Sequence, residues 1–187
     1  MTRADPDRDL IARTAAKDRA AMHALFARHN VRVFRFLMGR VRNEATAEEL
    51  TNEVFLEVWR QASRYEGRAA VSTWLLAIAH NKAMSLMRKR SEDELEDEMA
   101  EQIADAGDNP ELSAQKSSKA QIMRGVIETL SDEHHEVIDL VYYHEKSVRE
   151  VSEIVGIPEA TVKTRMHYAR KKLGELMREA GIDRGWP

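Results

Sequence analysis

The chain has 187 residues, of which 43% are hydrophobic and 33% charged, and its formal net charge is −3. It contains no cysteine, which excludes disulfide bonds, a thiol nucleophile and thiolate metal ligands. No stretch approaches the roughly 20 apolar residues that span a bilayer, and the N-terminus lacks the apolar core of a signal peptide, so we expect a cytoplasmic protein. Ala, Leu, Glu and Arg are frequent and no segment alternates like a strand, which predicts an all-α fold.

Charge is distributed unevenly along the chain. Residues 1–90 carry a net charge of +7, whereas residues 91–120 carry −8. The acidic stretch has a composition that disfavours an independent core. The sequence therefore predicts two small helical domains joined by a linker, with the boundaries 1–92, 93–120 and 121–187.

The linker permits two interpretations. Leu95, Met99 and Ile103 recur every four residues, so this part could form an amphipathic helix that docks on a partner. The simpler interpretation is a solvated tether.

Four helices are expected in the first domain, because apolar side chains recur there at helical spacing. The first begins near Asp7, and the second extends from about residue 20 to residue 40. Thr46 can cap the third helix, which continues through Trp59.

A loop at 65–70 separates the third helix from the fourth. Ser72 or Thr73 can cap the fourth helix, whose apolar positions include Trp74. This helix is expected to end in a cationic cluster: Arg88, Lys89 and Arg90.

The third helix has two chemically different sides. Leu50, Val54 and Val58 form an apolar side. The opposite side is a polar, mostly acidic ridge, composed of Glu49, Asn52, Glu53 and Glu57. Such a ridge suits a basic partner surface, although a solvated helix face is the simpler interpretation of these residues taken alone.

The second domain is expected to begin with helices at 121–130 and 137–142, with Ser131 as a cap between them. Residues 147–172 then read SVREVSEIVGIPEATVKTRMHYARKK. Gly156 tolerates the positive φ that often follows a helix end, and Pro158 suits the first turn of a new helix. Two short helices joined by so tight a turn are typical of a helix-turn-helix.

The second helix of this motif has an apolar stripe on one side, formed by Val162, Met166, Ala169 and Leu173. Cations and hydrogen-bond donors occupy the opposite side, and no acidic residue occurs between Thr161 and Leu173. A charged helix face is often only solvated, but the preceding turn favours DNA recognition. The candidate DNA-binding residues are Thr161, Lys163, Thr164, Arg165, His167, Tyr168 and Lys171.

Three histidines, His134, His135 and His144, raise the question of a metal site. Without cysteine or a clear pair of histidines at ligand spacing, zinc is disfavoured. We expect these side chains to cap helices or lie at the surface, and we expect neither a metal nor a cofactor.

Three segments occur in an order that resembles the extracytoplasmic-function (ECF) type of bacterial RNA polymerase sigma factor. AEELTNEVFLEVW at 47–59 is similar to the family's core-polymerase-binding helix. GRAAVSTWLLAIAHNKAMSLMRKR at 67–90 is similar to its promoter-melting segment, and the helix-turn-helix at 147–172 resembles its upstream-element reader. The resemblance covers nearly the whole chain.

The resemblance implies an alternative sigma factor, with sigma region 2 in the first domain and region 4 in the second. Such a protein is no enzyme: it binds core RNA polymerase, directs it to promoters and helps open DNA. The implied partners are the polymerase β′ clamp helices and β flap, promoter DNA and an anti-sigma factor. Glu49, Asn52 and Glu53 are implied to bind the clamp helices.

For the minus-ten element, the resemblance implies that Asn81 reads a flipped base, with Ser85 and Arg88 further along the same side of the helix. The cluster that ends in Lys89 and Arg90 would contact phosphate. The loop at 65–70 can supply a pocket wall, and Trp74 either stacks on DNA or packs in the core. The linker either threads the polymerase channel as a nucleic-acid mimic or is a passive tether.

Two other classes of protein compete with this interpretation. A free-standing helix-turn-helix regulator would explain residues 147–172 but would leave the polar ridge and the Arg88 cluster without roles. An enzyme is disfavoured because the sequence has no nucleophile-and-base constellation, no metal motif and no glycine-rich phosphate loop.

Overall fold

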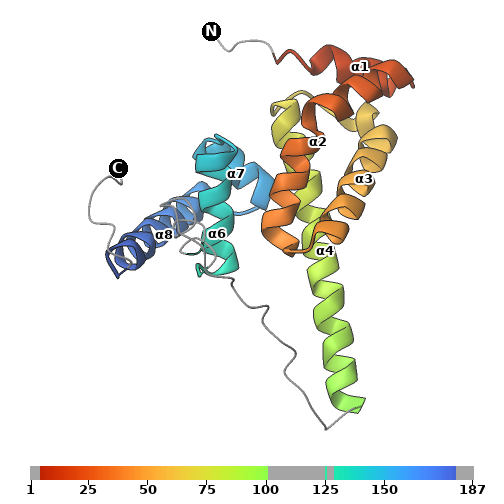
Figure 1. Ribbon diagram of the computed structural model, residues 1–187. Helices are drawn as coiled ribbons and strands as arrows, with labels where there is room; N and C mark the ends of the chain where they lie inside the picture. The colour runs from red at the N-terminus through yellow and green to blue at the C-terminus, as the bar shows by residue number, and fades with distance from the viewer. Residues whose placement is uncertain (1–4, 101–124, 126–128, 180–187) are drawn as a thin grey trace, which may run out of the picture.

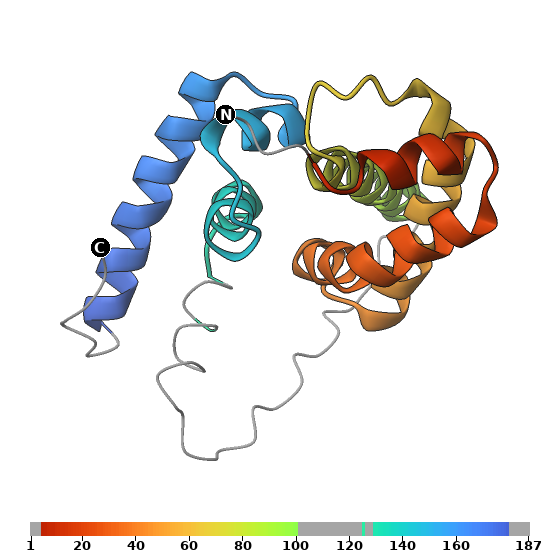
Figure 2. The same cartoon turned by 90° about the horizontal axis from the view of Figure 1, so that it is seen from above.

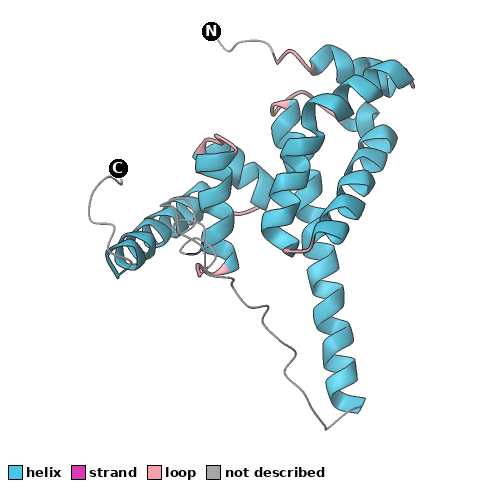
Figure 3. Ribbon diagram, viewed as in Figure 1, coloured by secondary structure: helices cyan, strands magenta, loops and turns pink. Residues whose placement is uncertain are grey.

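The computed structural model describes residues 5–100, 125 and 129–179 of the chain. In these residues every regular element is helical and none is a strand (Figure 3), so the predicted all-α fold is confirmed. The helix expected at 121–130 lies almost entirely outside the described residues, as does most of the expected linker.

The first domain is a bundle in which α2, α3 and α4 pack on one another and α1 packs against α2 and η1 (Figure 1). Its elements are α1 (Arg8–Ala15), α2 (Arg19–Val41), α3 (Glu44–Gln61), the 3₁₀ turn η1 (Ala62–Arg64) and α4 (Val71–Ala100). The core is aliphatic and aromatic, and its most completely buried side chains include Leu25, Phe36, Leu37, Val54 and Leu75.

The second domain is smaller and is built around the helix-turn-helix. Its elements are α6 (Asp132–Ile138), the π-helical turn η2 (Asp139–Tyr143), α7 (Val148–Val155) and α8 (Glu159–Glu179). Ser131 precedes α6 as predicted, but its side chain makes no capping hydrogen bond; its backbone carbonyl accepts one from the N–H of His135. The core side chains include Val137, Leu140, Val151, Ile154, Val162 and Leu173.

The third helix begins earlier than expected. The side chain of Asn43 accepts a hydrogen bond from the backbone N–H of Thr46 at 2.9 Å, and the backbone of Asn43 is extended, as an N-cap requires. Thr46 is therefore a residue of the first turn, and its predicted capping role is wrong.

The fourth helix differs from the prediction at both ends. It begins at Val71, ahead of Ser72 and Thr73, so neither hydroxyl is its cap. It continues past Arg90 to Ala100, because residues 91–100 contain no glycine or proline to end it. The boundary predicted at residue 92 thus falls within a continuous helix, and it stays a prediction.

The two domains pack against each other. α7 lies along α4, and both α6 and η2 touch α2 (Figure 2). Three polar side chains of the second domain are buried at this contact: Glu136, His144 and Lys146. The ring of His144 packs edge-on against Phe36 of α2, with 5.8 Å between ring centroids. This histidine stands at the C-cap position of η2, as one of the two expected alternatives has it, but it is buried and does not lie at the surface.

Candidate nucleic-acid interface

The helix-turn-helix is defined by strong local signals at both ends of α7. Ser147 and Glu150 form a reciprocal capping box at its start. Gly156 ends it with φ of 73°, in the left-handed region that glycine adopts without strain. Inside the turn, the hydroxyl of Ser152 donates to the carbonyl of Ile157 at 2.5 Å. These contacts fix the angle at which α8 leaves the turn.

α8 buries one side and exposes the other, as its sequence predicts. The four residues of its apolar stripe are all buried. Most of the predicted DNA-binding side chains are exposed, namely Lys163, Thr164, His167, Tyr168 and Lys171, while Thr161 and Arg165 are partly buried. The exposed surface therefore presents cations, hydroxyls and aromatic edges to the solvent.

Two arginines of α8 are engaged by other parts of the second domain. A guanidinium N–H of Arg165 donates to Glu133 Oε1 at 2.8 Å, and this arginine side chain is only 21% exposed. Arg170 donates to the hydroxyl of Tyr142 at 2.8 Å. These two hydrogen bonds hold α8 against α6, which contains Glu133, and against η2, which contains Tyr142.

The ridge predicted on the third helix is present on α3. Glu49, Asn52 and Glu53 are exposed, while the apolar side of the same helix is buried. Glu53 Oε2 accepts a hydrogen bond from Lys82 Nζ of α4 at 3.0 Å. Glu57, the fourth residue of the ridge, accepts a hydrogen bond from the side-chain amide of Gln61 on the same helix.

Asn81, Ser85, Arg88 and Lys89 share one exposed side of α4, here called its outer face, whereas Arg90, nine residues after Asn81, lies on the opposite side. Asn81, Ser85 and Lys89 line an open groove of about 500 Å³, which α4 forms with α3 and which also includes Glu53. Arg88 and Arg90 are exposed, and their contacts are long: Arg88 lies 3.8 Å from Glu92, and Arg90 lies 3.4 Å from the hydroxyl of Thr46. The groove therefore joins two members of the ridge, Glu53 and Glu57, to the basic end of the predicted melting segment.

A second, smaller hollow of about 220 Å³ lies under the loop that precedes α4. Tyr65 shapes it, because its hydroxyl donates to the carbonyl of Ala69 at 2.6 Å and its ring lies 5.3 Å from the ring of Trp74, at 51°. Trp74 is half-buried and lines this pocket. Asn81 does not line it: one helical turn, about 6 Å of rise, separates Asn81 from Ala77 at the pocket wall.

Residues near the N-terminus hold this loop in place, which the sequence analysis missed. Asp5 Oδ2 accepts a hydrogen bond from the backbone N–H of Val71 at 2.5 Å, and the guanidinium of Arg8 donates to the carbonyl of Gly67 at 2.6 Å. Gly67 has φ of 71°, which only glycine adopts readily. No local sequence pattern predicts these contacts, because the residues in each pair lie about 60 positions apart in the sequence.

The histidines do not come together in space. Among the described residues, no three His, Asp or Glu side chains are grouped closely enough to hold a metal ion. Burial lowers the pKa of His135, while His144 Nε2 lies 3.2 Å from Asp139 Oδ2.

Comparison with known proteins identifies the family. The Sigma-70 region 2 model matches residues 25–92, and the Sigma-70, region 4 model matches residues 126–175. The ECF RNA polymerase sigma factor SigK of Mycobacterium sp. (strain KMS) is 32% identical over 162 residues, which cover 84% of this chain and 83% of the relative. The chain belongs to the ECF family of RNA polymerase sigma factors. The family predicted from the three sequence segments is thus confirmed.

Other comparisons agree with this sigma-factor assignment. SigK of Mycobacterium tuberculosis (strain ATCC 25618 / H37Rv) is 29% identical over 167 residues, covering 88% of this chain and 89% of the relative. A solved structure of the sigma factor RpoE, in complex with the anti-sigma factor NepR from Bartonella quintana, has the same fold, with a TM-score of 0.67 and 24% identity over 87% of this chain and 98% of that chain.

Membership of the family gives the general activity. Sigma factors bind core RNA polymerase and promoter DNA, and they are initiation factors rather than enzymes. Within the part of the chain that the structure describes, no helix combines the length and the apolar character needed to cross a membrane.

Proposed function

We propose that this sigma factor reads the two promoter elements with two separate surfaces. The exposed side of α8 would bind the upstream, minus-thirty-five element. The outer face of α4 and the pocket under the preceding loop would bind the minus-ten element. The observation that carries the proposal is the division of α8 into a buried apolar stripe and an exposed side without acidic residues between Thr161 and Leu173.

On α4, the arrangement suits a melted strand. Trp74, Asn81 and Ser85 follow one another along the outer face of the helix, and the cations Arg88, Lys89 and Arg90 come next. An amide offers a donor and an acceptor to a base edge, an aromatic ring can stack on a base, and cations neutralise phosphate. The pocket would hold an unstacked base, Asn81 would read a base one turn further on, and the cations would hold the backbone.

For polymerase binding, we assign Glu49, Asn52 and Glu53 as the residues that dock on the β′ clamp helices. Their exposure on one side of α3, over a fully packed apolar side, supports this role. The second domain would contact the β flap. In this assembly the polymerase supplies the catalytic chemistry and the sigma factor supplies recognition, so the protein would act in the cytoplasm and would contribute no catalytic residue.

An anti-sigma factor is the proposed regulator. The structural neighbour RpoE was solved with the anti-sigma factor NepR, and its fold matches nearly all of this chain. A protein that covers the α3 ridge and the outer face of α8 would block polymerase and promoter together.

The deciding experiment is transcription in vitro from a genomic DNA library, with core RNA polymerase in the presence and absence of the protein, followed by mapping of the transcript starts. New starts that depend on the protein and share two upstream elements are expected. A Lys163→Ala, Thr164→Ala variant should lose these starts, whereas Arg178→Ala, a matched change at the far end of α8, should keep them. If core polymerase gains no initiation while the protein alone binds a duplex site tightly, a free-standing regulator is the correct function.

A further inference from the structure

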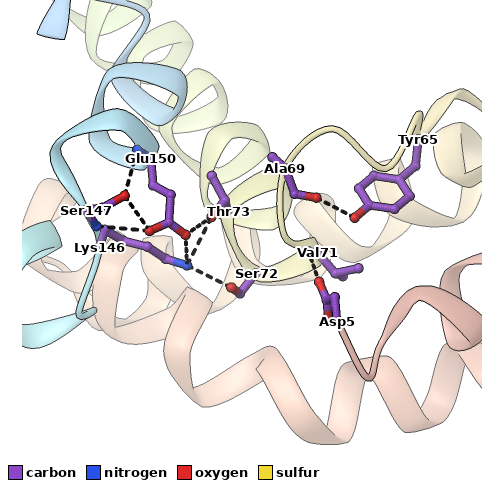
Figure 4. Close-up of polar contacts among 9 residues, drawn as sticks. All are labelled: Asp5, Tyr65, Ala69, Val71, Ser72, Thr73, Lys146, Ser147 and Glu150. Atoms are coloured by element: carbon purple, nitrogen blue, oxygen red, sulfur yellow. Dashed lines mark hydrogen bonds and ion pairs between the residues drawn. The ribbon is translucent and has the colours of Figure 1, made fainter. Parts of the chain in front are cut away.

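The pocket under the loop that precedes α4 takes its shape from that loop. The consecutive residues 64–69 line it, together with part of α4. Residues 65–70 lie between η1 and α4, outside regular secondary structure, so the hydrogen bonds of a helix do not fix their position. Within the loop, the hydroxyl of Tyr65 donates to the carbonyl of Ala69 at 2.6 Å (Figure 4). Contacts from elsewhere in the chain must therefore hold the loop in place.

Two hydrogen bonds to the loop come from the N-terminal segment, residues 5–8. The guanidinium of Arg8 donates to the carbonyl of Gly67, in the middle of the loop, at 2.6 Å. Asp5 Oδ2 accepts a hydrogen bond from the backbone N–H of Val71, where the loop ends, at 2.5 Å (Figure 4). Both bonds involve a charged group, and such bonds are roughly twice as strong as those between neutral groups. The segment thus holds the loop at two separate points.

The segment itself is fixed to α2 through the side chain of Asp7, which is 6% exposed. Its Oδ2 lies 2.7 Å from Nε2 of His29, itself only 7% exposed, and its Oδ1 accepts a hydrogen bond from Arg28. Separating a buried charged group from its partners is strongly destabilising, so these contacts keep the segment on α2. The backbone N–H of Asp7 also donates to Asp5 Oδ1 at 3.0 Å, which orients the carboxylate of Asp5 toward α4.

The position of the loop decides how its aromatic side chain faces α4. The rings of Tyr65 and Trp74 both line the pocket, with 5.3 Å between their centroids and an angle of 51°. Trp74 belongs to the helix, whereas Tyr65 moves with the loop. Groups that bind a ligand selectively must be held within about 0.5 Å of their productive positions by the contacts behind them. For Tyr65, the N-terminal segment supplies those contacts.

We propose that the N-terminal segment is a positioning element of the minus-ten site: Asp5 and Arg8 hold the loop in the shape with which the pocket discriminates among bases. This inference rests on the proposed function, since the pocket is part of the proposed minus-ten site. The two residues act through the loop and not by touching DNA. An aspartate is repelled by phosphate, so an effect of Asp5 on base selection has to pass through the loop.

Base selection is measured by transcription with core RNA polymerase and the full-length protein. The template is a promoter found in the library experiment, with each position of its minus-ten element replaced in turn by the three other bases. Arg8→Met and Asp5→Ala should each lower the preference for the best base at one position, that of the base held in the pocket. The expected loss is about fivefold, the effect of one ordinary hydrogen bond. Preference at the position read by Asn81 should stay the same, because Asn81 does not line the pocket.

Two further variants separate positioning from charge. Arg8→Lys keeps a cationic donor that can reach the carbonyl of Gly67, and it should restore most of the preference. Arg19→Met removes the same charge from an exposed position at the start of α2, and it should change nothing. A merely stabilising role of the segment would lower initiation from all templates by one factor and would leave the ratios between bases unaltered.

The shape of the loop is measured independently of transcription by fluorine NMR of protein labelled with 5-fluorotryptophan. The chain has three tryptophans, and Trp74→Phe assigns the signal of Trp74. Arg8→Met and Asp5→Ala should both shift this signal, because the nearby ring of Tyr65 moves with the loop; Arg19→Met should not. Thermal melting followed by circular dichroism checks that each variant is folded, and if one of the two is unfolded, the other decides.

The outcomes distinguish this inference from the proposed function. A shifted Trp74 signal together with a lowered preference at one position supports the positioning role. If the unchanged protein supports initiation but the folded variants keep all base preferences, the positioning role is wrong and the proposed function stands, whether or not the signal shifts. An unshifted signal also overturns the positioning role, because the loop then keeps its shape without the segment. If the unchanged protein supports no initiation, the proposed function fails and the positioning role fails with it.

Discussion

The carboxylate of Asp5 caps α4 by accepting a hydrogen bond from the backbone N–H of Val71 at 2.5 Å, across 66 residues of sequence. The first N–H groups of a helix have no partner within the helix, so an acceptor supplied from elsewhere stabilises its start. Here the acceptor comes from the N-terminal segment, and the helix it caps carries the proposed minus-ten residues (Figure 4). The N-terminal segment and the DNA-binding helix are therefore one structural unit.

Asp5→Ala should destabilise the first domain by about 1 kcal/mol, the usual cost of losing a side-chain N-cap. Urea unfolding measures this loss, with Asp9→Ala on the exposed side of α1 as the control. If both substitutions have the same small effect, the carboxylate of Asp5 does not cap α4 in solution.

Glu53→Arg should weaken binding to core polymerase severalfold, because it reverses one charge of the proposed docking ridge and places a cation beside Lys82. Binding of the upstream element by α8 should be unchanged, since Glu53 lies in the other domain. Affinity for core polymerase and affinity for duplex DNA are measured separately on the same preparation. Equal loss of both would indicate global misfolding rather than loss of a docking contact.

Lys163→Ala should weaken binding of the upstream element and lower the steepness of its salt dependence. Removing one phosphate contact reduces the slope of log K against log salt concentration by about 0.9. The measurement is a series of DNA-binding titrations at increasing salt concentration. Arg178→Ala should leave both affinity and slope unchanged; a slope that falls equally in the two variants would mean that net charge, not a contact by Lys163, is responsible.

Lowering the pH should weaken the contact between the domains, because it protonates the carboxylate of Glu150 that accepts a hydrogen bond from Thr73. Burial acts to raise the pKa of this carboxyl group, but hydrogen bonds from Ser147 and Thr73 and the charge of Lys146 outweigh it and lower the pKa to about 2. Because the pKa is lower in the folded protein than the ordinary value of 4.5, the ionised group stabilises the fold above about pH 4.5. That stabilisation is lost progressively as the pH falls from about 4.5 to about 2.

The pH effect is measured as the free energy of unfolding between pH 6 and pH 3. Glu150→Gln should have a flatter profile over the acidic part of this range. Because the carboxylate is partly exposed to solvent, we expect the pH-dependent loss of unfolding free energy to differ between the unchanged protein and Glu150→Gln by only about 1 kcal/mol. Parallel profiles for the two proteins would show that Glu150 does not titrate with a lowered pKa.

The features that the sequence alone determined are those set by neighbours within a few residues. The period of apolar side chains in α8 fixes which side is buried, and Ser147, Glu150 and Gly156 mark the two ends of α7 through hydrogen bonds and backbone angles that are local. The helix-turn-helix, the ridge on α3 and the family could therefore be predicted.

The tertiary structure decided what depends on partners far apart in the sequence. Ser72 and Thr73 have the right chemistry for a helix cap, yet Asp5 provides that cap and the two hydroxyls bind Lys146 and Glu150 of the other domain. His144 stands at the end of η2, as one expected alternative has it, but it is buried against Phe36 of the other domain and not at the surface. A local pattern shows that a side chain can donate, accept or be buried; only the fold decides which distant group it meets, because that choice is made by the packing of whole helices.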